Sequence, residues 1–334
     1  MLQKQKLQKS PQQKPTQSNQ YSERDEKMAN ITAKDVAALR AKTGIGMMEC
    51  KKALVEAEGD MDAAIKILRE KGELKAESKM ATRIAADGVV EILKDGNSTA
   101  MIEVNSETDF VAKNESFKEF VADLLKIIIA QKPADVEALM ACKFNDEMTV
   151  EEKTKEMIFK IGEKLTVRRF VVVDGVTSTY IHGTGSIGVI AKFETNVADK
   201  AEFAAFAKNI ALQIGAYPTP YLNRDQVPAS VIEEEKSILL AQIANDPANA
   251  KKPDAIKEKM VLGRISKFYD NNCLVDMTYV KDEDMKVGQY VKATAKELGG
   301  EIEIVDFYRF EKGEGIQKRE ENFAEEIAKM TAGK

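Results

Sequence analysis

The sequence predicts an α+β protein, in which a bundle of three helices precedes two related subdomains that combine strands with helices. Apolar residues recur at helical spacing over residues 31–82. A strand-like run, an Asp-Gly turn and a returning strand follow at residues 88–104. The end of that strand and the start of the next helix then recur near residues 189–206, which indicates a duplicated subdomain.

Residues 1–27 form a separate leader, rich in Gln, Lys and Ser and nearly free of hydrophobic residues. A segment with so little apolar surface cannot offset the entropy of ordering its chain, so we expect it to be disordered. An upstream start codon, a tag and a short tail all stay open as its origin. A mitochondrial presequence fits less well, because such presequences are poor in acids and this leader contains Glu23, Asp25 and Glu26.

Residues 28–82 are predicted to form the domain of three short helices. Thr32 is the expected N-cap of the first helix, and the Thr-Gly-Ile-Gly segment that contains Gly44 ends it. The second helix is expected from Met47 to Ala57, and Gly59-Asp60 is expected to cap the third. A bundle of this size has a small core, which is typical of a docking module.

The core is predicted as two α+β subdomains: residues 83–173, and a second subdomain split into residues 174–226 and 270–316. The insertion at residues 227–269 contains two amphipathic stretches joined by an Asn/Pro-rich link, which predicts an antiparallel helical hairpin. A final helix is expected over residues 317–334. The other expected helices of the core are 116–130, 134–141, 150–162 and 289–298, and the expected strands are 88–93, 99–104, 167–173, 189–193 and 301–310.

Candidate catalytic and metal-binding groups are sparse. His182 is the only histidine, and no nucleophile motif lies near it in the sequence. No phosphate-binding P-loop sequence occurs. The three cysteines are scattered singly, which fits neither a disulfide framework nor a structural zinc site. We therefore expect no catalytic residue, no metal and no cofactor, and hence no enzyme, with His182 serving an interface.

One motif imitates a cofactor site. The segment Gly183-Thr-Gly-Ser-Ile-Gly188 matches the glycine pattern of dinucleotide-binding loops. Such a loop needs a following helix, whose N-terminus meets the pyrophosphate, whereas Val189-Ile-Ala-Lys-Phe is typical of a strand. We interpret the glycines as a hairpin turn and keep an oxidoreductase only as the least favoured hypothesis.

The overall composition excludes two classes of partner. A net charge of −5 argues against a protein that grips nucleic acid phosphates directly, because that requires a basic surface. No apolar run approaches the ~20 residues that span a bilayer, so we expect no membrane contact. Sparse, unpaired cysteines fit a reducing cytosol, and a cytoplasmic location is expected.

The most informative cluster runs from Glu107 to Asn114, at the junction of a predicted strand and a predicted helix. In one interpretation Thr108 or Asp109 caps the helix and Phe110 packs inward. In the other interpretation Asp109 and Phe110 project from a rigid corner, as a charge beside a wedge. Such a pair is suited to prying at a metal or phosphate site of another protein.

From Met28 onward the sequence resembles the elongation factor Ts family, the exchange factors of the GTPase elongation factor Tu. The combination of TGIGMM with TDFV is specific to that family. Ser186 departs from it, because the family commonly has a basic residue at this position. The matching stretches are TGIGMMECKKAL at 43–54, AADGVV at 85–90, TDFVAKN at 108–114, YIHG at 180–183, IGV at 187–189 and RFEKGEGI at 309–316.

This resemblance implies a guanine-nucleotide exchange factor whose partner is elongation factor Tu. It implies that the corner intrudes at the Mg²⁺ site of the partner and dislodges the ion. The bundle would then be of the ubiquitin-associated type and dock on the nucleotide-binding domain, and the hairpin at 227–269 would be a coiled coil. The residues implied at the Mg²⁺ site are Thr108, Asp109, Phe110 and Val111, and the other implied partner contacts are Gly44, Met47, Met48, His182 and Gly183.

The residues leave one alternative function and one assembly question open. The helical bundle could bind its partner as a plain adaptor, with no effect on nucleotide release. A homodimer is also compatible with the sequence. An assay of GDP release from elongation factor Tu separates the exchange factor from the adaptor.

Overall fold

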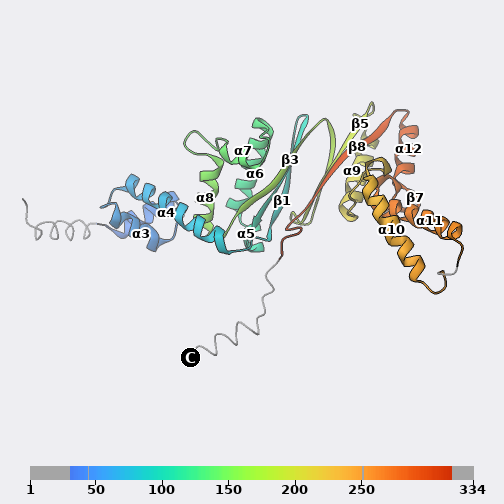
Figure 1. Ribbon diagram of the computed structural model, residues 1–334. Helices are drawn as coiled ribbons and strands as arrows, with labels where there is room; N and C mark the ends of the chain where they lie inside the picture. The colour runs from blue at the N-terminus through green and yellow to red at the C-terminus, as the bar shows by residue number, and fades with distance from the viewer. Residues whose placement is uncertain (1–30, 44, 250–251, 318–334) are drawn as a thin grey trace, which may run out of the picture. The chain divides into compact units, whose positions relative to one another are not determined.

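The computed structural model describes residues 31–43, 45–249 and 252–317, drawn in colour in Figure 1. Its helices and antiparallel sheets confirm the α+β class. The described chain divides into two compact units, residues 31–82 with 155–162, and residues 83–154 with 163–317. The finer subdomain boundaries stay predictions. The leader at 1–27, Gly44 and residues 318–334 of the expected final helix lie outside the described residues.

The first unit contains the three N-terminal helices, which pack around a small apolar core that includes Leu39, Leu54 and Leu68. Thr32 begins the first helix as predicted: its hydroxyl accepts the N–H of Asp35 at 3.2 Å, and the Asp35 carboxylate accepts the N–H of Thr32 at 2.9 Å. Assignment to the ubiquitin-associated type stays a prediction. The helices are α2 (Ala33–Thr43), α3 (Met47–Glu56) and α4 (Met61–Thr82).

Helix α4 is longer than the sequence predicts. It runs for 22 residues, where the sequence indicated a short helix. The chain beyond Gly72 continues with Glu, Leu, Lys and Ala, which are strong helix formers, whereas a single glycine weakens a helix by only about 1 kcal/mol. Helix propensity therefore carries α4 through this glycine to its end at Thr82.

A three-stranded antiparallel sheet forms the first half of the second unit. Its order is β1-β2-β3, and a turn at Gly96, with φ of 55°, joins the first two strands. Helix α6 covers one face of this sheet, because Phe117, Leu124 and Ile128 recur at helical spacing and are all buried (Figure 1). The elements are β1 (Asp87–Asp95), β2 (Ser98–Ser106), α5 (Asp109–Ala112), α6 (Glu115–Gln131), α7 (Val136–Ala141), α8 (Val150–Ile161) and β3 (Thr166–Asp174).

A second antiparallel sheet, of order β4-β5-β8, repeats this plan. Phe203 and Phe206 of α9 pack on Phe193 of β5, with ring centroids 5.5 and 6.1 Å away. In each predicted repeat, the helix with the Phe-x-x-Phe pattern therefore covers its own sheet. The elements are β4 (Val176–His182), β5 (Ile187–Thr195), α9 (Ala201–Ala216), α12 (Val287–Leu298) and β8 (Ile302–Glu311).

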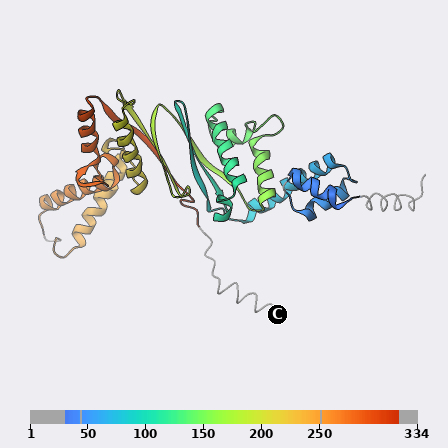
Figure 2. The same cartoon turned by 180° about the vertical axis from the view of Figure 1, so that it is seen from behind.

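The two sheets pack on each other through the faces that the helices leave open, as both views show (Figures 1 and 2). Val90 and Met101 of the first sheet share one buried cluster with Ile190 of the second. The hydroxyls of Thr99 and Thr177 meet between the sheets at 2.7 Å. The second unit is therefore layered, with two sheets inside and helices outside.

The predicted insertion contains two helices, α10 (Ala229–Asn245) and α11 (Asp254–Asn272). They contact each other through a cluster of Leu239, Ile243, Val261 and Ile265, and their description as a coiled coil stays a prediction. The sequence did not indicate the two-stranded sheet that follows. Its strands β6 (Thr278–Tyr279) and β7 (Asp282–Lys286) are short, and β7 is mostly charged, so neither shows the alternation typical of a strand.

Candidate functional site

The candidate site is the corner between β2 and α5, where the chain turns from strand into a helix of four residues. Phe110 is 78% exposed, whereas its neighbour Val111 is buried at 6%. Successive residues of a helix point about 100° apart, so burial of Val111 turns Phe110 toward solvent. The interpretation in which Phe110 packs inward is therefore wrong.

Thr108 precedes α5 but does not cap it with its side chain. Its hydroxyl instead donates to Oε1 of Glu163 at 2.8 Å, and its N–H donates to Oε2 of the same carboxylate at 3.0 Å. Thr108 therefore occupies the N-cap position, as one interpretation predicted, but its hydroxyl makes no cap hydrogen bond because it donates to Glu163.

Asp109 stands at the first position of α5 and is half exposed. Lys113, four residues later, binds its carboxylate with an Nζ–Oδ2 distance of 2.6 Å. This hydrogen bond from Lys113 lowers the pKa of Asp109 below its ordinary value. The carboxylate is therefore ionised at neutral pH, and it is held by a lysine that is itself exposed.

Lys113 also lies over the ring of Phe110, with Nζ 5.8 Å from the ring centroid. One turn of chain thus holds an anionic carboxylate, an aromatic ring and a cation together at the surface. A ring in this position can enter an apolar gap in another protein. The carboxylate beside it can bring negative charge to a cation or to the ligands of a cation.

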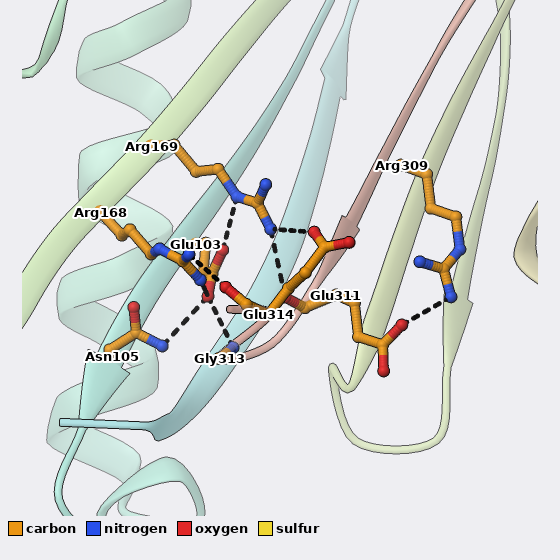
Figure 3. A network of polar contacts seen from close by, with 8 residues as sticks. All are labelled: Glu103, Asn105, Arg168, Arg169, Arg309, Glu311, Gly313 and Glu314. Carbon is orange, nitrogen blue, oxygen red and sulfur yellow. Dashed lines mark hydrogen bonds and ion pairs between the residues drawn. The ribbon is translucent and has the colours of Figure 1, made fainter. Parts of the chain in front are cut away.

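Behind the corner, β2 is fixed by a buried carboxylate, that of Glu103 (Figure 3). Arg168 and Arg169 donate to it at 2.9 and 2.6 Å, and the N–H of Gly313 donates at 2.8 Å. Burial by itself raises the pKa of Glu103, but these hydrogen bonds, with one from Asn105, outweigh burial and lower it. The network joins β2 and β3 to the chain that follows β8.

Three further ion pairs hold this end of β8. Arg169 pairs with Glu314 at 3.1 Å, and Arg309 pairs with Glu311 at 2.8 Å (Figure 3). Lys312 pairs with Asp87 of β1 at 2.6 Å. The chain after β8 is thereby tied to β3 through Arg169 and to β1 through Asp87, the two strands that flank β2.

His182 ends β4 and is exposed, and its Nδ1 lies 2.8 Å from the hydroxyl of Tyr180. A turn through Gly183 and Gly185, with φ of 57° and 90°, then leads into β5. A strand and no helix follows the glycines, which confirms the hairpin turn. A Cβ on Gly185 would lie 2.3 Å from Val89, so this glycine allows the turn to approach the first sheet.

The predicted site residues that the structure describes belong to three chain segments, one in the first unit and two in the second. Met47 and Met48 begin α3 in the first unit, and their side chains are 39% and 67% exposed. Thr108 to Val111 share the corner, and His182 with Gly183 belongs to the β4–β5 turn of the second unit. Gly44 lies outside the described residues.

Sequence reasoning missed two partners of the corner. Lys113 could have been found, because Asp and Lys four residues apart on a helix are a recognised pair. Glu163 gave no signal, since it lies 55 positions beyond Thr108 and only the tertiary fold brings them together.

In residues 31–43, 45–249 and 252–317, no group of three or more His, Cys, Asp or Glu side chains is arranged to hold a metal ion. No helix in the same ranges has the length and apolar character needed to cross a bilayer. Cys50, Cys142 and Cys273 are all free thiols.

Comparison with known proteins gives a consistent result. A family model described as Elongation factor TS matches residues 107–314. Elongation factor Ts of Clostridioides difficile is 48% identical over 307 residues, which cover 91% of this chain and 99% of that protein. Elongation factor Ts of Syntrophotalea carbinolica is 45% identical over 305 residues, covering 90% and 99%. That of Clostridium kluyveri is 44% identical over 311 residues, covering 91% and 100%.

Proposed function

The chain belongs to the elongation factor Ts family of translation elongation factors, and on this premise we propose that it promotes the release of GDP from elongation factor Tu. The observation that supports this proposal most strongly is the corner, where Phe110 is 78% exposed beside the ionised Asp109. Exposure of a large apolar ring to water is unfavourable, so burial of the ring against a partner protein would contribute favourably to binding.

The proposed mechanism acts on the Mg²⁺ ion that bridges GDP and the GTPase. Bound Mg²⁺ keeps several waters and demands near-ideal octahedral geometry, so a small displacement of its ligands weakens it. Phe110 enters between side chains of the partner and displaces them. Asp109 leaves Lys113 and interacts with the ligands and waters of the ion. GDP then loses its cation and dissociates, and no covalent bond is made or broken by this chain.

Thermodynamic linkage makes the effect reciprocal. If binding of this chain weakens GDP, then GDP weakens binding of this chain by the same factor, a coupling of about 1–3 kcal/mol or more. Excess GTP therefore displaces the exchange factor and completes the cycle. In this proposal the protein is not an enzyme, and it works in the cytoplasm without a cofactor.

Other surfaces supply affinity in this proposal. Met47 and Met48 expose flexible apolar side chains at the start of α3, which suits docking on a second protein surface. Gly44, three residues before Met47 in the sequence, and His182 with Gly183 on the β4–β5 turn complete the proposed contacts. These groups bind, whereas Asp109 and Phe110 act on the nucleotide site, and the buried Val111 and the Glu163-bound Thr108 hold the corner that carries them.

A release assay tests this function. Elongation factor Tu is loaded with a fluorescent GDP, mixed with excess unlabelled GDP and followed with and without this protein, at several Mg²⁺ concentrations. We expect strong acceleration that is largest when Mg²⁺ is plentiful, since removal of the ion already speeds the unassisted reaction. Binding without acceleration would instead identify an adaptor and refute the proposal.

A further inference from the structure

We propose that Glu163 and Glu107 are positioning residues that hold the Asp109–Phe110 corner in its active orientation. This inference rests on the function proposed above and identifies what fixes the orientation of the corner. The contacts form a reciprocal arrangement, here named the carboxylate clasp, of Glu107, Thr108, Glu163 and Lys164.

In the carboxylate clasp, each glutamate accepts the backbone N–H of the residue that follows the other glutamate. Glu163 accepts the N–H of Thr108 at 3.0 Å and its hydroxyl at 2.8 Å. Glu107 accepts the N–H of Lys164 at 2.5 Å. Two chain segments that lie far apart in the sequence are thereby joined by three charge-assisted hydrogen bonds, each about twice as strong as a neutral one.

Arg83 supplies the opposite charge to the clasp. Its guanidinium donates to Oε2 of Glu107 at 3.0 Å, and its carbonyl accepts from the ammonium of Lys164 at 3.0 Å. Glu107 is largely buried, with 17% of its side chain exposed, so the nearby guanidinium compensates a carboxylate that has lost much of its water. All of these contacts lie within the second unit.

The corner needs such support because α5 is too short to be stable without contacts to the rest of the protein. A helix of four residues is far below the roughly 12–15 residues at which an isolated helix becomes marginally stable. The side chain of Thr108 makes no cap, so the usual local stabilisation of a helix start is missing. The direction of Phe110 therefore depends on burial of Val111 on one side and on the clasp on the other.

Glu163→Ala tests the clasp, and Glu152→Ala is its matched control. Glu152 accepts the N–H of Thr149 at 2.8 Å and its hydroxyl at 3.3 Å, so it makes the same kind of contact at the start of α8, away from the corner. In Glu163→Ala we expect hydrogen exchange of the Thr108 amide to accelerate about tenfold or more, because its charged acceptor is gone. Glu152→Ala should leave that amide protected.

The functional readout is the maximal rate of GDP release at saturating exchange factor. Glu163→Ala should lower this rate several-fold with less change in the concentration needed for half-saturation, whereas Glu152→Ala should leave both unchanged. A conservative Glu163→Gln variant, which keeps one acceptor oxygen for the Thr108 N–H, should restore part of the rate. A role limited to overall folding predicts instead that both alanine variants lose the same fraction of activity.

A double-mutant cycle separates positioning from general damage. If Glu163 acts through the corner, Glu163→Ala should lower the release rate by a smaller factor in the Phe110→Ala background than in the wild-type protein, because one of the two groups that it positions is already gone. Additive losses, or unchanged protection of the Thr108 amide in Glu163→Ala, would overturn the inference. If the wild-type protein gives no acceleration, the proposed function fails, whereas the exchange of the Thr108 amide still decides whether the clasp holds the corner.

Discussion

Replacing Phe110 by alanine separates the functional role of this ring from a structural one. Complete burial of a phenylalanine side chain stabilises a protein by about 1.5–3 kcal/mol. Because Phe110 is 78% exposed, only about a fifth of that stabilisation is present in the free protein, so Phe110→Ala should lower the free energy of unfolding by less than about 0.7 kcal/mol. The rate of GDP release should nevertheless fall strongly.

Phe117→Ala is the matched comparison, because it removes the same side chain from the same unit. Phe117 lies on α6 and is fully buried. Its loss should cost about 3–5 kcal/mol, the usual cost of deleting a core aromatic ring. Urea unfolding of both variants gives the free energies, and release assays at equal concentrations of folded protein give the activities.

The reasoning is refuted by either of two results. Phe110→Ala could unfold as easily as Phe117→Ala, which would place the ring in the core. It could also keep the full release rate per folded molecule, which would remove the ring from the mechanism.

Three further predictions concern the charges and the backbone around the corner. Lys113→Ala should raise the pKa of Asp109 toward its ordinary value, as measured by carbon-13 NMR titration, because the hydrogen bond that lowers it is lost. Glu103→Gln should make the free energy of unfolding fall less steeply as the pH is lowered. In the folded protein the pKa of Glu103 is lowered, so its carboxylate stabilises the fold at pH values above about 4.3, the pKa of an unfolded-chain glutamate. This stabilisation is lost as the pH falls through the folded-state pKa. Gly313→Ala should cost about 1–3 kcal/mol in urea unfolding, because φ is 70° and a Cβ would lie 2.3 Å from the carbonyl oxygen of Ala86.

Each of these has a clear contrary outcome. An unchanged pKa of Asp109 in Lys113→Ala would mean that the ion pair does not persist in solution. If the free energy of unfolding falls equally steeply with decreasing pH in wild type and in Glu103→Gln, then protonation of the buried carboxylate does not contribute to the loss of stability in acid. A Gly313→Ala variant as stable as wild type would mean that residues 311–314 do not need their close approach to β1.

Most of the fold could be predicted because its signals are local. The Asp95-Gly96-Asn97 turn between two apolar runs identified the β1–β2 hairpin, and the apolar spacing from Phe117 to Ile128 identified α6. The β6–β7 pair was not predicted, because its strands are too short to show the alternation of apolar and polar residues that is typical of a strand. α4 exceeded its predicted length because helix propensity outweighed one glycine.

The site was predictable in position but not in orientation. A strand followed by a capping sequence located the corner at Thr108 and Asp109, and the family resemblance identified its importance. The direction of Phe110 depends on which residue of the four-residue helix is buried, and that residue is Val111. It also depends on Glu163, which lies far from Thr108 in the sequence and accepts the hydrogen bond of the Thr108 hydroxyl. Such long-range hydrogen bonds leave no trace in local sequence patterns.

The most direct measurement is the dissociation rate of fluorescent GDP from elongation factor Tu, followed by stopped flow at saturating Asp109→Ala/Phe110→Ala double variant. If the corner drives release, this variant should still form a complex with the GTPase but leave the dissociation rate close to that of the GTPase alone. A saturated complex that releases GDP as fast as the wild-type complex would contradict the account at its centre.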